Sequence, residues 1–185
     1  MQRDLFNEYT LPRGFLYRPE VLTPQEGQSL VAQFGHLPFK PFEFHGYLGH
    51  RRIVSYGLRY DYAKRRVEPA EPLPDFLFGL RDRAAAALDV PSERIAHGMV
   101  TEYTPGAGIG WHLDKPEFEE VIAFSLLAPC RLRFRRKMGD GWERRAAEIA
   151  PHSLYALRGE SRWAWQHSIA PMDRLRYSVT FRTSR

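Results

Sequence analysis

Gly110-Trp111-His112-Leu113-Asp114-Lys115 is the stretch around which the rest of this chain is organised, and it follows the glycine-rich turn Pro105-Gly106-Ala107-Gly108. In an extended strand the period of two turns His112 and Asp114 to one face and Leu113 to the other. An imidazole and a carboxylate then point the same way, and both are metal ligands. Alone, the motif is weak, because solvated histidine and aspartate are common beside glycine turns.

A third candidate ligand, His167, lies downstream in Trp165-Gln166-His167-Ser168-Ile169. Two histidines and one carboxylate form the facial triad that holds Fe(II) and leaves coordination positions open for oxygen chemistry. We therefore predict a metal centre that consists of His112, Asp114 and His167.

The stretch Arg176-Tyr177-Ser178-Val179-Thr180-Phe181-Arg182 alternates polar and apolar residues, as a half-buried strand does. Its polar side chains share one face, and the two arginines are separated by about 20 Å of strand. A guanidinium fork suits each end of a short dicarboxylate. The alternative is an edge strand with a basic outer face. The H-x-D motif and the later histidine, in this order, favour the dicarboxylate.

Together these motifs resemble those of the AlkB family of iron- and 2-oxoglutarate-dependent dioxygenases. The resemblance covers roughly Gly98 to Arg182, and the first ninety residues carry little of it. The matching segments are Tyr103-Thr104-Pro105-Gly106-Ala107, His112-Leu113-Asp114-Lys115, Gly159-Glu160-Ser161-Arg162, Arg176-Tyr177 and Thr180-Phe181-Arg182.

The resemblance implies that the three predicted ligands hold Fe(II), which acts with 2-oxoglutarate and O₂. Arg176 would pair with the distal carboxylate of 2-oxoglutarate, Tyr103 would hydrogen-bond it, and Arg182 would lie toward the carboxylate nearest the metal. Thr101 and Ser178 stand where other members often carry asparagines near the cosubstrate. For an N-methylated base, flipped into the pocket, hydroxylation of the methyl group gives an unstable hemiaminal that releases formaldehyde.

Residues 45–62 interleave tyrosines and arginines, so that rings could stack on bases while arginines hold phosphates. AlkB-like enzymes carry a nucleotide-recognition lid before the barrel, and the resemblance assigns base contacts to Arg52, Tyr56 and Tyr60. Glu117 is a fourth candidate, because it follows Pro116, which replaces an acidic residue found near the flipped base in several repair members. The alternative is a hairpin whose tyrosines pack on the barrel and whose arginines are solvated.

Residues 131–145 predict a basic hairpin that turns at Asp140-Gly141. This hairpin, including Arg135 and Arg145, either lies along a phosphate backbone or is a solvated charged face. Salt-sensitive binding separates the two alternatives.

Thr23-Pro24-Gln25-Glu26 is a capping box that predicts a helix ending at Phe34, before Gly35. Apolar residues at helical spacing predict a second helix that stops near Pro91. They are Phe76, Leu77, Leu80, Ala84, Ala87 and Leu88. From Ala96 onward, short β-branched and aromatic segments alternate with turns. We therefore expect an α+β protein with a double-stranded β-helix (jelly-roll) core and supporting helices from the N-terminal half.

The composition of the 185 residues fits one domain, with helical support and the lid in residues 1–95 and the catalytic core in 96–185. A single cysteine, Cys130, suggests a buried thiol in a reducing cytoplasm. The net charge of +5 rests on 23 arginines and four lysines, which favours an anionic partner. No apolar run is long enough to span a bilayer, so we expect a soluble protein. We also expect it to be cytoplasmic and monomeric.

Three classes of function fit these observations. We favour an oxidative demethylase of N-alkylated bases in DNA or RNA. The second class is an oxygenase with the same site that acts on a protein or a small molecule, and the third is a nucleic-acid-binding module with a vestigial site. The triad and both arginines argue against the third class. The sequence does not distinguish DNA from RNA or single from double strands, nor does it identify the alkylated base.

Overall fold

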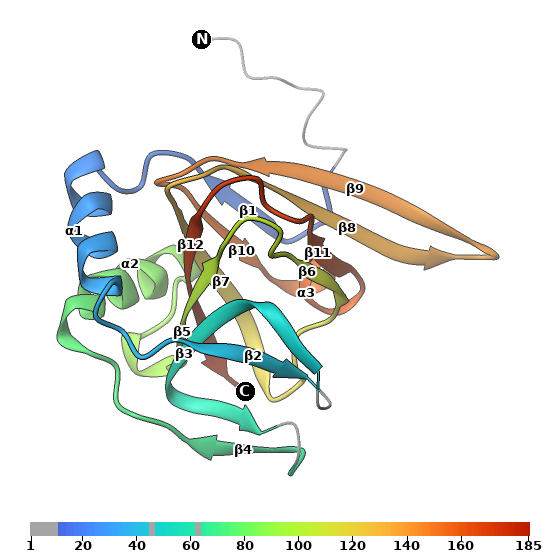
Figure 1. The fold of residues 1–185 in the computed structure, drawn as a ribbon. Helices are drawn as coiled ribbons and strands as arrows, with labels where there is room; N and C mark the ends of the chain where they lie inside the picture. Colours follow the sequence, from blue (N-terminus) through green and yellow to red (C-terminus); the bar gives the residue numbers. More distant parts are fainter. Residues whose placement is uncertain (1–10, 45–46, 62–63) are drawn as a thin grey trace, which may run out of the picture.

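Two antiparallel β-sheets form the centre of the protein in the computed structural model, which describes residues 11–44, 47–61 and 64–185 (Figure 1). The larger sheet has the order β1-β10-β7-β12-β5-β3-β2, with β4 paired to β3. Its strands are β1 (Phe15–Arg18), β2 (Lys40–Phe44), β3 (Tyr47–Asp61), β4 (Arg66–Pro69), β5 (Ile95–Tyr103), β7 (Phe118–Leu126), β10 (Leu154–Leu157) and β12 (Arg176–Ser184).

The smaller sheet has the order β6-β11-β8-β9. Its strands are β6 (Ile109–His112), β11 (Gln166–Ile169), β8 (Cys130–Met138) and β9 (Gly141–Ile149). Phe134 and Leu132 of this sheet pack with Tyr155 and Val121 of the larger sheet in one buried cluster. The two sheets therefore enclose a common core, and the predicted jelly roll in an α+β protein is confirmed.

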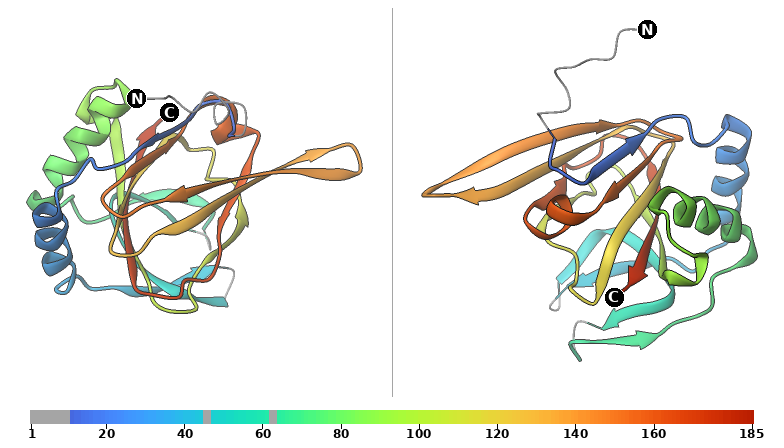
Figure 2. Two further views of the ribbon diagram at one scale, coloured as in Figure 1. Left: turned by 90° about the horizontal axis from the view of Figure 1, so that it is seen from above. Right: turned by 180° about the vertical axis from the view of Figure 1, so that it is seen from behind.

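Helices α1 (Pro24–Phe34) and α2 (Phe78–Leu88) cover the other face of the larger sheet (Figures 1 and 2). Thr23 caps α1 as predicted: its Oγ1 accepts from the Glu26 amide at 3.2 Å, and Glu26 Oε2 accepts from the Thr23 amide at 2.8 Å. The short helix α3 (Gly159–Trp163) precedes β11. Single 3₁₀ turns span Asp75–Leu77 and Ser92–Arg94. No helix of the described ranges is both long and apolar enough to cross a membrane.

The register of β12 against β5 confirms the predicted polar face of the last strand. Arg176 pairs with Tyr103, Ser178 with Thr101, Thr180 with Met99 and Arg182 with His97. Residues that are directly opposite in an antiparallel pair point to the same side of the sheet. All eight side chains therefore face the core between the two sheets, whereas Tyr177, Val179 and Phe181 face the helices.

The register of β3 corrects two residues of the predicted lid. Arg52 pairs with Glu102 and Tyr56 with Gly98, which places both side chains on the helix-covered face of the larger sheet. Tyr56 is buried in the core beneath the helices. Arg52 forms a bidentate ion pair with Glu102, with N–O distances of 2.7 and 2.9 Å. Neither side chain points toward the smaller sheet, which carries His112 and His167.

The basic hairpin consists of β8 and β9 and projects well beyond the body of the protein (Figure 2). Met138 pairs with Gly141, so the two-residue turn is Gly139-Asp140, one residue earlier than predicted. Gly139 has φ +53°. A positive φ of this kind is required by the tight turns that match the twist of a hairpin, and glycine adopts it without strain.

Candidate metal centre and cosubstrate site

The three predicted metal ligands come together at one end of the smaller sheet. His112 ends β6, Asp114 lies two residues beyond it, and His167 sits directly opposite His112 on β11. The two imidazole centroids are 4.3 Å apart, and Nε2 of His167 lies 3.3 Å from Oδ2 of Asp114. One donor atom from each residue lies within 4.8 Å of the others. The predicted triad is thus assembled by strand register rather than by a single loop.

Neighbouring groups fix the orientation of two ligands. Nδ1 of His112 lies 2.9 Å from the Gly110 carbonyl oxygen, a contact that suits an N–H donor and leaves the lone pair of Nε2 for a metal. Arg182 donates to Oδ1 of Asp114 from Nε at 3.0 Å and from Nη2 at 2.8 Å. The second oxygen, Oδ2, is buried without a hydrogen bond among the described residues. Asp114 therefore keeps one oxygen for a cation.

The electrostatics of the site hold the ligands in their metal-binding forms. Burial and the neighbouring His167 lower the pKa of His112 to about 4. Arg51 contributes a little to that lowering. Burial would raise the pKa of Asp114, but Arg182 and the two histidines outweigh it and hold that pKa well below its usual range. At neutral pH the site thus offers a neutral His112 and a carboxylate, as metal ligation requires.

This donor set fits Fe(II). Two imidazoles and a carboxylate on one side of an ion leave the opposite positions for other ligands. The buried Nδ1 of His167 has no hydrogen-bond partner in the described part of the chain, so its tautomer is not locked by the protein. Met99, Tyr103 and Thr180 line the cavity beside the ligands, which gives a cosubstrate a place next to the metal.

Arg176, predicted to pair with the distal carboxylate of 2-oxoglutarate, is a buried positive charge in the structure. Its side chain is 0% exposed and its Nε donates to Ser125 Oγ at 3.1 Å. The guanidinium lies 4.9 Å from the centroid of the Tyr103 ring. Nη1 and Nη2 have no hydrogen-bond partner among residues 11–44, 47–61 and 64–185. Two unpartnered donors of one fork match the two oxygens of a carboxylate.

The polar side chains near this charge occupy the predicted places. Thr101 and Ser178 are buried opposite each other on β5 and β12. Thr101 Oγ1 also lacks a hydrogen-bond partner within the described residues. Arg182 lies at the metal end of the same face, where it holds Asp114. The roles of these residues toward 2-oxoglutarate remain predictions that the arrangement favours.

The sequence assigned no role in the site to three residues, Ser125, His97 and Arg162, although Arg162 ends one of the segments that resemble the AlkB family. Ser125 orients Arg176, and His97, which the register places opposite Arg182, lies 3.1 Å from it through Nδ1. Arg162 is buried, and its Nη2 donates to the carbonyl oxygens of Lys115 and Phe118, both at 2.7 Å. The alternation of β5 would have pointed to His97, but the contacts of Ser125 and Arg162 are long-range and leave no local pattern.

The four predicted substrate residues are not brought together. Arg52 and Tyr56 lie on the helix-covered face, as described above. Tyr60 lies beyond the point where β3 leaves β5, and its ring centroid is 4.3 Å from Nζ of Lys115, the residue after Asp114. Glu117 is exposed on the turn that follows this ligand loop. Of the lid residues, Tyr60 is thus the one that the structure places beside the metal ligands.

Comparisons with known proteins agree with this site. The model of the 2OG-Fe(II) oxygenase superfamily matches residues 16–182, so the chain belongs to that superfamily. Within it, the chain is a member of the AlkB family, whose homologues it matches along nearly its whole length. Fe(II), 2-oxoglutarate and O₂ are therefore its cofactor and cosubstrates, and it is a dioxygenase.

Two relatives illustrate the similarity. The chain is 29% identical to the "Alkylated DNA repair protein ALKBH8 homolog" of Arabidopsis thaliana over 97% of its own length and 57% of the relative. It is 28% identical to the "tRNA (carboxymethyluridine(34)-5-O)-methyltransferase ALKBH8" of Mus musculus, over 87% of its own length and 25% of the relative. It therefore spans little more than half of the first protein and a quarter of the second.

Two solved structures share the fold. The structure of OsALKBH1 has a TM-score of 0.72 at 16% identity, over 95% of this chain and 98% of that one. A prolyl-4-hydroxylase of Pseudomonas putida has a TM-score of 0.61, also at 16% identity, over 93% of each chain. The jelly roll is thus shared with both structures, one of which is named as a prolyl-4-hydroxylase.

Proposed function

We propose that this oxygenase removes N-linked alkyl groups from nucleic-acid bases by oxidising the carbon bonded to nitrogen. The observation that carries the proposal is the Tyr60–Lys115 pair, one residue beyond the ligand Asp114. An aromatic ring and a cation suit a base and its phosphate, respectively. The names of the Arabidopsis and mouse relatives, which mention alkylated DNA and tRNA, support a nucleic-acid substrate.

The bound iron and cosubstrates would supply the oxidation chemistry, and residues of the chain would hold and orient them. Fe(II), with O₂ and 2-oxoglutarate, supplies the oxidant that turns a C–H bond of the alkyl group into C–OH, while 2-oxoglutarate becomes succinate and CO₂. The triad would hold the iron, and Arg176 would fix the cosubstrate through its distal carboxylate. Arg182 keeps Asp114 charged and oriented.

The second half of the reaction needs no oxidant. The hydroxylated carbon leaves as an aldehyde when its bond to nitrogen breaks. The hydroxyl proton passes to water, and the base nitrogen takes up a proton in return. A base attached to its chain would reach the site by flipping out of its stack.

Mass spectrometry of methylated DNA and RNA oligonucleotides tests the proposal. We expect the methylated base to lose its methyl group, with formaldehyde and succinate formed in equal amounts and only in the presence of 2-oxoglutarate. Asp114→Ala is the matched control for metal-dependent chemistry. Succinate formation without any change in every methylated DNA and RNA tested would overturn the assignment of substrate.

A second candidate is hydroxylation of a protein or a small molecule. The fold is shared with a prolyl-4-hydroxylase, and two of the four predicted base contacts face away from the site. Incubation with peptide and metabolite mixtures would reveal stable hydroxylation of a carbon. If such a product forms at a useful rate and no oligonucleotide is altered, this candidate replaces the first.

A further inference from the structure

The outer face of the smaller sheet carries an ordered stack of tryptophans and cations. Arg135 lies between two indole rings, with its Cζ 4.6 Å from the centroid of Trp111 and 4.2 Å from that of Trp142. Arg133 lies 5.2 Å from Trp111, and Nζ of Lys137 lies 5.5 Å from Trp142. We call these five residues the outer ladder. It starts beside the metal ligand His112 and runs onto the projecting hairpin (Figure 1).

Strand register explains why these side chains share one face. Arg133, Arg135 and Lys137 alternate along β8, and Lys137 is directly opposite Trp142 on β9. Arg144 joins the same face opposite Arg135. Trp111 precedes His112 on β6, so the two side chains point to opposite faces of the smaller sheet. His112 faces the other predicted metal ligands, and Trp111 faces outward. The outer ladder therefore lies on the reverse side of the strands that hold the iron ligands.

Four of the five cations of this face form no ion pair within the described residues. Arg133 and Arg135 donate to the neutral Ser168 Oγ at 3.1 Å and Gln166 Oε1 at 2.7 Å. No ion pair with a described residue is formed by these two arginines, by Lys137 or by Arg144. Arg131 is the exception, because it pairs with Glu148 at 3.5 Å. Five cations thus share this face with one carboxylate of β9.

The opposite face of the same hairpin is neutralised. Arg136 pairs with Glu143 at 2.6 Å and with Glu160 at 2.7 Å, and Arg145 pairs with Glu143 at 2.5 Å. Arg145, predicted together with Arg135 to contact phosphates, is therefore already matched by a carboxylate. The hairpin is not uniformly basic: its charge excess is confined to the face of the outer ladder.

We propose that the outer ladder binds the single-stranded nucleic-acid chain that flanks the target base, an inference that rests on the proposed function. Stacking on indoles fixes Arg135 and Arg133, so little side-chain entropy remains to be lost when they meet phosphates. Trp142 is 37% exposed and offers ring surface to an unpaired base. Closely spaced cations repel one another, and a polyanion relieves that repulsion. The surface lies outside the cavity of the metal centre, so it anchors the substrate without touching the reacting atoms.

Binding of an unmodified, fluorescently labelled single-stranded oligonucleotide to the iron-loaded protein tests this proposal by anisotropy. Trp142→Ala should weaken binding about 5-fold to 150-fold. Arg144→Gln should reduce the slope of log affinity against log salt by about 0.7, the value for one lost contact with a single strand. Turnover of 2-oxoglutarate with a small alkylated nucleoside, which is too short to reach the hairpin, should be unchanged in both variants.

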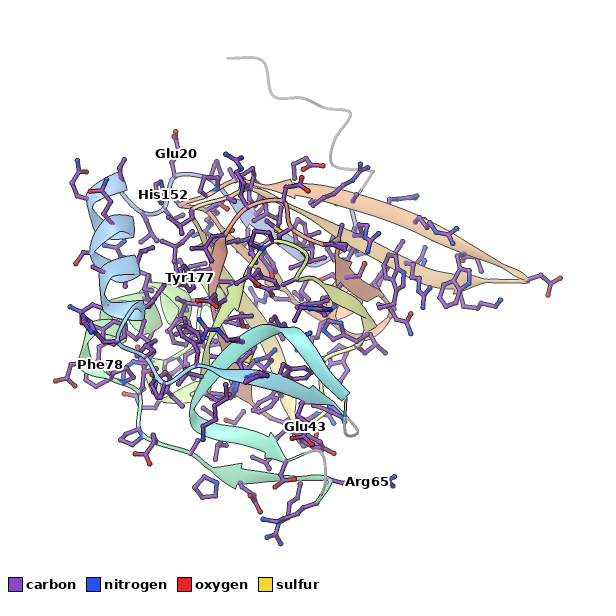
Figure 3. All side chains as sticks on the ribbon, in the orientation of Figure 1. Glu20, Glu43, Arg65, Phe78, His152 and Tyr177 are labelled. Carbon is purple, nitrogen blue, oxygen red and sulfur yellow. The ribbon has the colours of Figure 1, made fainter. Side chains whose placement is uncertain are left out.

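Helix α2 offers a matched control. Phe78 is 38% exposed, and Arg81 lies 4.7 Å from its ring centroid, on the side of the protein away from the hairpin (Figure 3). Phe78→Ala and Arg81→Gln remove an exposed ring and an arginine without touching the outer ladder, and Arg81, unlike Arg144, pairs with a carboxylate, Asp82, at 2.9 Å. We expect both to bind the oligonucleotide like the wild type. Equal weakening by the α2 and hairpin variants would show a general charge effect and overturn the proposal.

Two further outcomes are decisive. If the hairpin variants keep the oligonucleotide affinity but lose binding to phosphatidylserine vesicles, the surface serves a membrane and the proposal is wrong. If the hairpin variants lose oligonucleotide affinity although the wild type oxidises no alkylated base, the binding role of the outer ladder is supported and only the proposed reaction is wrong. Because the binding probe carries no alkyl group, the two hypotheses are tested separately.

Discussion

Arg182 and Asp114 meet at a single oxygen: Nε and Nη2 of the arginine both donate to Oδ1, at 3.0 and 2.8 Å. The other carboxylate oxygen, Oδ2, faces His167 at 3.3 Å. The arginine thus divides the carboxylate between two tasks, because one oxygen fixes its position and the other is available to iron.

Arg182→Gln should weaken Fe(II) binding about 10-fold to 100-fold, as is typical when a group that orients a metal ligand is removed. Asp114→Ala should abolish both iron binding and succinate release. Anaerobic titration with Fe(II) measures the first effect, and succinate detection measures the second. Wild-type iron affinity in Arg182→Gln would show that Asp114 needs no partner to bind metal.

Arg176→Ala should weaken 2-oxoglutarate binding by about 2–5 kcal/mol, because a buried carboxylate would lose its charge partner. This corresponds to a loss of roughly thirtyfold to several thousandfold in affinity. Calorimetric titration with 2-oxoglutarate measures it, and oligonucleotide affinity should change far less. Arg176→Lys keeps the positive charge but not the two-pronged guanidinium. Its affinity for 2-oxoglutarate should lie between those of the wild type and Arg176→Ala. An unchanged 2-oxoglutarate affinity in Arg176→Ala would place the cosubstrate elsewhere.

Tyr60→Ala should weaken oligonucleotide binding, whereas Tyr56→Ala should destabilise the fold. Loss of a stacking ring at Tyr60 should cost about 1–3 kcal/mol of oligonucleotide binding and leave the melting temperature nearly unchanged. Loss of the buried Tyr56 should destabilise the fold by about 3–5 kcal/mol, as truncation of a large aromatic core residue does. Anisotropy and thermal unfolding separate the two effects. The reverse pattern would restore Tyr56 to the substrate site and remove Tyr60 from it.

Arg162→Ala should lower iron affinity about tenfold or more, although Arg162 is not itself a ligand. Its Nη2 holds the carbonyl groups of Lys115 and Phe118, which flank the loop beyond Asp114. Arg158→Ala is the control, because Arg158 lies at the start of the same helix and pairs with Glu120 instead. That variant should change stability alone. Parallel losses of iron affinity in both variants would indicate a general loosening of the helix.

The ion pair of Arg52 with Glu102 should make stability depend on pH. Arg52 lowers the pKa of the buried Glu102 carboxyl against the opposing effect of burial, and Tyr177 contributes a further hydrogen bond. A lowered pKa stabilises the fold above the unfolded value of about 4.3, and the stabilisation disappears as pH falls through the folded pKa.

Arg52→Ala should therefore cost about 1–2 kcal/mol at neutral pH, less than a fully buried pair, because the Arg52 side chain is 48% exposed. The difference from the wild type should shrink as pH falls through the lowered pKa of folded Glu102, below which Glu102 is protonated in both proteins. Melting temperatures measured at several pH values test this. A difference that grows on acidification would contradict the assignment.

Local patterns predicted much of this protein. The capping box at Thr23, the alternation of Arg176 to Arg182 and the H-x-D motif each depend on neighbours in the sequence, and the structure contains all three elements as predicted. Contacts between distant segments could not be read in this way. Arg162 lies in a segment that resembles the AlkB family, but its contacts could not be predicted, because its partners lie 47 and 44 residues away.

The error in the lid has a specific cause. Arg51 and Arg52 are adjacent, so the sequence does not show which of them faces the metal, and a shift of one residue reverses every side chain of a strand. The structure places Arg52 on the helix side, whereas Arg51 lies close enough to His112 to affect its pKa. Gly57, with φ +72°, breaks the regular alternation of side chains within β3, so the pattern before it does not predict the position of Tyr60.

The pairing of His112 with His167 across β6 and β11 has a consequence for folding. If β11 were displaced by one residue, His167 would turn to the solvent side of the sheet and the third ligand would be lost. A shifted sheet cannot bind iron tightly, whereas the native one can. Iron binding therefore stabilises the native register of β6 and β11 over a shifted one. The metal that takes part in the reaction also favours the correct alignment of these two short strands.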